Sequence, residues 1–290
     1  MMAGMMTKGM RILLFLFFPI LCLLSCSEAE DRGREDEVPF AFEIAVNPNT
    51  KSDAAIQLPG DCVVWVYDNE DTVLDGERLV RGGSLWYPEG RQNWPVGCGE
   101  LSFYAACPRE RAAFSLDEGV QFLDYSLDED LQPLYAGPFS MDNAHSSAGV
   151  VSLVFSRALA LVRFNFSAML REGSSLTVKK VVIDGVYDRG DFRTEPSVVW
   201  QPKGERKTIE VYEGGFEAGN ALERLCEVWM IPQNVRAEVK VICDIDSGGN
   251  VLHDQELTCT TDFAWKTSKL SVYNLKVNLA LELGVEKDME

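Results

Sequence analysis

The sequence predicts an all-β protein built from β-sandwiches, and three observations support this class. Apolar and polar residues alternate with period two in many short segments, which is the pattern of half-buried strands. Helical periodicity is scarce and confined to short segments. Turn-forming residues close most of the apolar runs, and many short strands separated by turns are best closed by packing two sheets together.

The first predicted strand covers residues 40–46, where Phe40, Phe42, Ile44 and Val46 alternate with other residues before the turn sequence NPNT. Further strand patterns end at turn residues, and they are CVVWVYD (62–68), LSFYAACP (101–108), TIEVYEGGF (208–216), and a hairpin of AEVKVICDI (237–245) with VLHDQELTCT (251–260). The segment LSVYNLKVNLALEL (270–283) alternates throughout and predicts one strand with one apolar face. We interpret two segments, FSLDEGVQFL (114–123) and AGNALERLC (218–226), as short helices.

The longest apolar run downstream of the N-terminus, residues 150–168, changes phase near Ser156 and Arg157. Apolar residues have one parity before this point and the other parity after it. Such a change indicates a bulge or a change of partner sheet. We expect the last strand of one sandwich (38–156) to become the first strand of a second one (157–290). One bulged strand inside a single domain is the alternative.

The N-terminus has the pattern of an export signal, with Lys8 and Arg11 ahead of an apolar run too short to span a membrane. Leu23-Leu24-Ser25-Cys26 resembles a bacterial lipobox, which predicts a signal peptide over residues 1–25 and a lipid on the Cys26 thiol. The alternative is an ordinary signal with an incidental cysteine. Residues 26–37 contain four glutamates and two aspartates and predict an acidic tether. This tether is either a solvated spacer or a surface-export signal.

Composition limits the function. Removing residues 1–25, which hold two basic and no acidic residues, takes the formal charge from −18 to −20, so nucleic-acid binding is not expected. Six cysteines follow Cys26 without zinc-ligand spacing, and several sit in apolar runs, which favours mostly unpaired core thiols over disulfides. They are Cys62, Cys98, Cys107, Cys226, Cys243 and Cys259.

Catalytic motifs are absent from the sequence, so we expect neither an enzyme nor a metal or other cofactor. The histidines, His145 and His253, are far apart, and no nucleophile elbow, P-loop or dinucleotide fingerprint occurs. Asp128 with Asp130 is read as surface charge rather than as a glycosidase pair. Trp86 and Trp94 flank the loop WYPEGRQNWP and are either a platform for stacking on a sugar or packed aromatics of the sandwich.

Several packing motifs occur in a fixed order along the chain. They are NWP (93–95), LSFYAACP (101–108), LYAGPF (134–139), VSLVFSRALALVRFNF (151–166), VVIDGVYDRGDF (181–192) and WMIPQNV (229–235). In this order the motifs resemble the fimbrillin-like lipoproteins, the type V pilus subunits of anaerobic Gram-negative bacteria. Arg157 departs from the pattern, because members often carry histidine there, and residues beyond Val235 match less well.

The resemblance implies two tandem β-sandwiches of transthyretin-like topology and a lipid-anchored protein of the outer membrane, exposed on the cell surface or in a fimbria. It also implies a pilus or adhesin subunit that a trypsin-like protease matures and that joins other subunits by strand donation. The candidate cleavage points are Arg32, Arg34 and Lys51, and only a cut at Lys51 would release the strand 40–46. The C-terminal strand, 270–283, would either complete the second sandwich or be donated. The rival hypothesis is a surface glycan-binding lipoprotein of a polysaccharide-uptake system, with Trp86 and Trp94 as the platform.

Overall fold

The computed structural model describes residues 38–47, 61–95, 97, 99–129, 132–142 and 149–288. These residues confirm the all-β class, because they form strands, turns and one short 3-10 turn, η1 (Arg109–Arg111). None of the helical structure in these residues has the length and apolar character that a membrane span requires. The signal peptide, the tether, Cys26, Arg32, Arg34 and Lys51 lie outside the described residues, as does Cys98.

An N-terminal sheet closes on itself in the strand order β1-β4-β3-β2-β5-β8-β9. The predicted alternation of the first strand is confirmed, because Phe40 and Phe42 are fully buried inside this sheet while Glu43 is exposed. The strands are β1 (Ala41–Val46), β2 (Cys62–Asp68), β3 (Asp71–Gly82), β4 (Leu85–Pro88), β5 (Glu100–Cys107), β8 (Leu134–Asp142) and β9 (Val150–Arg157).

A small four-stranded sheet packs against the outer face of the N-terminal sheet. Phe122 and Phe192 pair across it and share a core with Trp65 and Tyr104 of the larger sheet. The small sheet joins strands from both halves of the sequence, because β7 pairs with β12. Its order is β13-β12-β7-β6, and its strands are β6 (Ala112–Ser115), β7 (Gly119–Ser126), β12 (Arg189–Arg193) and β13 (Val199–Lys203).

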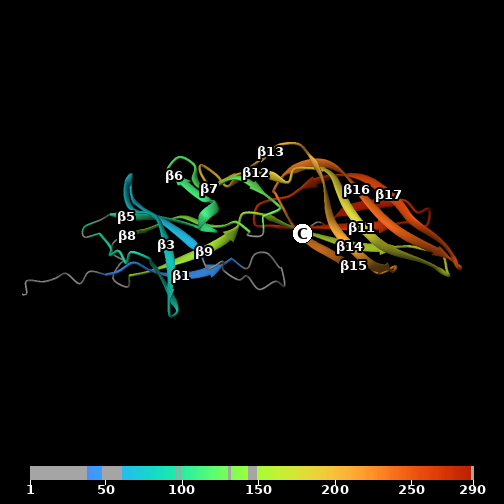
Figure 1. Ribbon diagram of the computed structural model, residues 1–290, viewed down its shortest axis with the longest axis horizontal. Helices are drawn as coiled ribbons and strands as arrows, with labels where there is room; N and C mark the ends of the chain where they lie inside the picture. Colours follow the sequence, from blue (N-terminus) through green and yellow to red (C-terminus); the bar gives the residue numbers. More distant parts are fainter. Residues whose placement is uncertain are drawn as a thin grey trace, which may run out of the picture. The chain divides into compact units, whose positions relative to one another are not determined.

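The C-terminal half forms two four-stranded sheets around one apolar core. The predicted hairpin is confirmed: β16 and β17, orange in Figure 1, run side by side and turn at Gly248 and Gly249. Both glycines have positive φ, and this backbone conformation is nearly free of steric cost for glycine because it has no side chain. One sheet contains β10 (Ala160–Ala168), β15 (Glu223–Met230), β18 (Leu270–Val277) and β19 (Leu283–Lys287). The other sheet contains β11 (Ser174–Val186), β14 (Lys207–Ala218), β16 (Asn234–Ser247) and β17 (Asn250–Ala264).

The phase change near residue 157 coincides with a change of sheet. β9 belongs to the closed N-terminal sheet and β10 to a C-terminal sheet. Arg157 is 8% exposed, with its guanidinium 4.3 Å from the ring centroid of Trp229 and bonded to the Gln132 side chain. Burial lowers the pKa of Arg157 from its usual value. The division into domains at 156/157 stays a prediction, since the small sheet joins strands from both sides of it.

Both helix predictions are wrong. Residues 114–123 form parts of the β6–β7 hairpin, where Val120 and Phe122 are fully buried while Leu116 and Leu123 are about half exposed. Gly119 has φ +66°, and its position leaves no room for a Cβ beside the Thr194 hydroxyl. Within 218–226, β15 begins at Glu223 and pairs with β10. Long-range pairing overrides weak helical spacing in both segments.

The single long strand expected over 270–283 is also wrong. The chain turns after Val277, where the Asn278 side chain accepts hydrogen bonds from the backbone N–H of Ala280 and Glu282 at 2.9 and 3.0 Å. Asparagine favours such turns because its side chain bonds to its own backbone. β18 lies inside its sheet, between β10 and β19. It therefore completes the C-terminal sheets in this structure.

The expectation of mostly unpaired thiols is correct for Cys226, Cys243 and Cys259 and wrong for Cys62 and Cys107, which form a disulfide. Val63 of β2 lies opposite Ala106 of β5, so the next residues outward, the two cysteines, meet at the ends of the strands. Burial is the main cause that raises the pKa of Cys226 to about 12 and that of Cys243 to about 11. These two thiols are therefore neutral at physiological pH.

We expect iodoacetamide to label Cys226 and Cys243 slowly in the native protein, because the thiolate is the reacting form. Below its raised pKa, each further pH unit should increase the thiolate fraction of Cys226 about tenfold. Peptide-resolved mass spectrometry between pH 7 and pH 10 measures the labelling. A rate for Cys226 that levels off near pH 9 would contradict the raised pKa. The urea-unfolded protein is the control in which both thiols should react fast.

Candidate functional site

The first strand, β1, is paired along its whole length on one side. Residues Ala41–Val46 pair in parallel with Val150–Phe155 of β9, and Figure 1 shows β1, in blue, beside β9. Backbone hydrogen bonds continue at both ends, from Ala41 N to Gly149 O at 2.9 Å and from Asn47 N to Phe155 O at 2.7 Å. β9 therefore supplies a complete backbone template for an extended segment.

The other side of β1 is only partly paired. β1 and β4 pair at one position, Phe42 opposite Trp86. Ahead of β1, the Trp94 N–H donates to the Val38 carbonyl at 2.8 Å, and Pro39 bridges to Asn93. The closed sheet is therefore completed by one paired position between β1 and β4, and by the backbone bonds just ahead of β1, which include that from Phe40 N to Gln92 O at 2.9 Å. An extended strand here lies in a slot between β9 and β4.

Two aromatic side chains fill the slot from β1. Phe40 and Phe42 are fully buried, and the Phe40 ring centroid lies 4.7 Å from that of Trp94 and 6.3 Å from that of Phe103. Burying a phenylalanine side chain contributes about 1.5–3 kcal/mol. Removal of β1 would therefore uncover an apolar, aromatic groove together with the unpaired backbone of β9.

Trp86 and Trp94, the two aromatic candidates for sugar stacking, both lie beside this slot. Trp94 is 7% exposed and packs on Phe40, and Trp86 is half-buried against the same core. Trp94 therefore has no free face for a sugar while β1 is in place. The glycan hypothesis at these residues stays untested.

The described residues provide no catalytic constellation at the slot, which is built from aromatic and aliphatic side chains. Within the described ranges, no group of three or more histidine, cysteine, aspartate or glutamate side chains is placed to hold a metal ion. The arrangement can hold an extended strand: it offers backbone donors and acceptors for affinity and apolar positions for specificity.

Contacts with Phe40 and Phe42 were not predicted from sequence, because they join residues far apart in the chain. The alternation of residues 40–46 shows which side chains turn inward but not which partners they meet. Arg32, Arg34 and Lys51 lie outside the described residues, so the structure does not place the predicted cleavage points. The fold thus defines an all-β protein in which the first strand, β1, pairs along its whole length with β9 and at one position with β4.

The chain belongs to a fimbrillin-like family, because the model of that family matches residues 42–289. This confirms the resemblance seen in the sequence and extends it beyond Val235. Among the curated proteins, none matches this chain.

Solved structures of Bacteroides proteins share the fold. A fimbrial protein from Bacteroides vulgatus has a TM-score of 0.60 at 11% identity, over 87% of this chain and 98% of that chain. A protein described as a candidate cell adhesion protein, from Bacteroides uniformis, has a TM-score of 0.55 at 15% identity, over 89% and 99%. A third, from Bacteroides ovatus with the same description, has a TM-score of 0.53 at 13% identity, over 87% and 96%. At these identities the similarity shows the fold.

Proposed function

We propose that this protein is a non-enzymatic pilus or adhesin subunit that assembles by strand donation. Membership of a fimbrillin-like family implies a cell-surface location and contact with other pilus subunits. The observation that carries the proposal is the slot of β1, whose backbone template on β9 and aromatic floor suit any extended segment with alternating apolar residues.

In this proposal, a protease with trypsin-like specificity cuts the chain at Lys51, between β1 and β2. β1 then has no covalent link to the rest of the subunit and leaves the slot, and a strand from the next subunit replaces it. A cut at Arg32 or Arg34 would instead free the subunit from its anchor and keep β1. The anchor is the lipid on Cys26, after export directed by residues 1–25.

Limited trypsin digestion tests the order of these events. We expect the purified full chain to form ladders resistant to sodium dodecyl sulfate only after cleavage, with a new N-terminus at residue 52. Lys51→Gln should remove the ladders, while the matched control Arg34→Gln should keep them. Ladders formed equally well by the uncut chain or by Lys51→Gln would contradict the proposal.

A synthetic peptide with the sequence of residues 38–47, VPFAFEIAVN, should compete with the incoming strand. We expect an excess of this peptide, added during digestion, to cap the slot and shorten the ladders. The matched control peptide replaces Phe40 and Phe42 by alanine and should have little effect, because it lacks the side chains that fill the slot. Equal inhibition by both peptides would argue against recognition in this slot.

A further inference from the structure

Three lysines of the described residues differ from all the others in having no ion pair. Six lysines each lie within ion-pair distance of a carboxylate, and they are Lys179, Lys180, Lys203, Lys207, Lys240 and Lys276. The remaining described lysines, Lys266, Lys269 and Lys287, have no such partner among the described residues. The chain carries a net charge of −18, so carboxylates are abundant, yet none among the described residues lies within ion-pair distance of these three lysines.

The three lysines surround two adjoining hollows. Lys266 and Lys269 line both, and Lys287 lines the smaller one with Asp288. The larger hollow has a volume of about 610 Å³ and is lined by no aspartate or glutamate. Its size is in the range of pockets that hold small ligands. Unpaired cations beside a concave surface indicate an anionic ligand.

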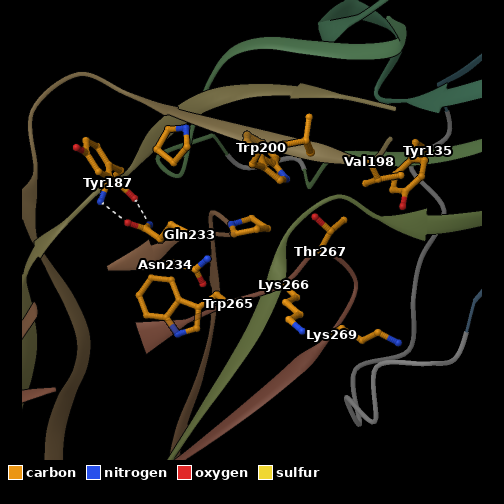
Figure 2. Close-up of a pocket in the computed structure, with 13 residues that line it drawn as sticks. Tyr135, Tyr187, Val198, Trp200, Gln233, Asn234, Trp265, Lys266, Thr267 and Lys269 are labelled. Carbon is orange, nitrogen blue, oxygen red and sulfur yellow. Dashed lines mark hydrogen bonds between the residues drawn. The ribbon is translucent and has the colours of Figure 1, made fainter. Parts of the chain in front are cut away.

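Fixed side chains form part of the wall of the larger hollow. Gln233 is 6% exposed and makes two hydrogen bonds with the Tyr187 backbone, at 3.0 and 2.9 Å. The Trp200 indole N–H donates to the Ala158 carbonyl at 2.7 Å. Figure 2 shows Gln233 bonded to Tyr187, Trp200 above the hollow in this view, and Lys266 below it. The wall is thus preorganised, and Lys266 and Lys269, which line it, are exposed. The Lys287 ammonium, beside the smaller hollow, donates to the Ala264 carbonyl at 3.2 Å.

Apolar and neutral polar groups complete the lining. Val198 and Val199 are 42% and 41% exposed beside the hollow, which is far more than most valines of the described chain. Asn234 and Thr267 add amide and hydroxyl groups without charge. Exposed apolar side chains beside hydrogen-bonding groups suit a sugar, which has C–H faces and hydroxyl edges.

An acidic peptide fits this surface less well. The strand that borders the hollow, β13, is at the edge of its sheet, where a peptide could add as a further strand. Pro202 lies within β13 and has no N–H to donate to such a strand. Contacts from side chains to a compact ligand are therefore favoured over backbone pairing with an extended one.

We propose that the hollow beside Lys266 and Lys269 binds an anionic carbohydrate, an oligosaccharide that carries carboxylate or sulfate groups. The lysines contact the anionic groups, the valines cover the apolar face of a sugar ring, and Asn234 and Thr267 contact hydroxyls. None of the residues that line this hollow belongs to the slot of β1.

Isothermal titration of the full chain, purified in detergent, tests the site with four probes. These are a trimer of galacturonic acid, a sulfated disaccharide, neutral maltotriose and a peptide of six glutamates. We expect at least one of the two anionic sugars to bind more tightly than both maltotriose and the glutamate peptide. Its binding should weaken as the sodium chloride concentration rises, because salt screens exposed charges. The better of the two anionic sugars shows whether carboxylate or sulfate is preferred.

The lysine variants give the matched comparison. Changing Lys266 and Lys269 together to glutamine should weaken binding of the anionic sugar at least about tenfold. The control Lys179→Gln removes an exposed lysine that is already paired with Asp254 and should change the affinity less than about twofold. Both lysine sites are exposed, so thermal melting should be unchanged. The proposal would be overturned if maltotriose or hexaglutamate bound as tightly as the better anionic sugar, or if neither anionic sugar bound. It would also be overturned if the double lysine variant bound the anionic sugar as tightly as the wild type.

Discussion

Replacing both Cys62 and Cys107 by alanine is expected to lower the free energy of unfolding by about 4 kcal/mol. The bond closes a segment with a sequence separation of 45 residues, and a crosslink over such a distance restricts the unfolded chain strongly. Both cysteines are fully buried, so the removed sulfurs also leave a space in the core. Urea unfolding of the N-terminal sheet, followed by tryptophan fluorescence, measures the loss.

Cys259→Ala is the matched control, because Cys259 is a half-buried free thiol. Its effect should stay below about 1 kcal/mol. A reducing agent should lower the stability of the wild type and of Cys259→Ala and leave the double variant unchanged. If the double variant and the control shift the urea midpoint equally, the disulfide is not formed in the native protein.

The sequence predicted best the strands that carry a local signal, which is either a run of β-branched and aromatic residues ended by turn residues or an alternation of apolar and polar residues. β2 has the bounds read from CVVWVYD, and the phase change at residue 157 coincides with the step from one sheet to another. Side-chain alternation is a local property, so it can be read without knowledge of the fold. The family resemblance was also found from local motifs, and the family match confirms it.

Predictions failed where long-range pairing decides the structure. Residues 114–123 have the spacing of a short helix, yet Phe122 pairs with Phe192 in another part of the chain. The disulfide required the register of β2 against β5, which brings positions 62 and 107 opposite each other. Neither pairing has a signal in the local sequence, since both depend on which strands become neighbours.

The candidate sites contain both features that local sequence predicted and features that depend on contacts between distant residues. The inward-facing set of Phe40 and Phe42 was predicted from alternation, and the burial of both confirms it. Trp86 and Trp94 were singled out for their type and spacing, and the structure places them beside β1. The lysine hollow was missed, because Lys266 and Lys269 become notable only once the ion pairs of the other lysines are known.

Phe42→Ala should lower the free energy of unfolding of the uncut chain by about 3–5 kcal/mol, because it removes a fully buried ring from the core of the N-terminal sheet. Glu43→Ala is the matched control: it lies next to Phe42 in β1, is exposed, and should change stability by about 0.5 kcal/mol or less. Urea midpoints of the uncut proteins measure both effects.

The assembled form gives the sharper comparison. If β1 leaves during assembly, Phe42 is absent from the polymer, so cut Phe42→Ala should form ladders as resistant to detergent and heat as those of the wild type. Phe103→Ala alters the wall of the slot, since the Phe103 and Phe42 ring centroids lie 6.5 Å apart, and it should weaken both uncut chain and polymer. A polymer weakened by Phe42→Ala as much as the uncut chain would mean that β1 stays in place, and strand replacement in this slot would be excluded.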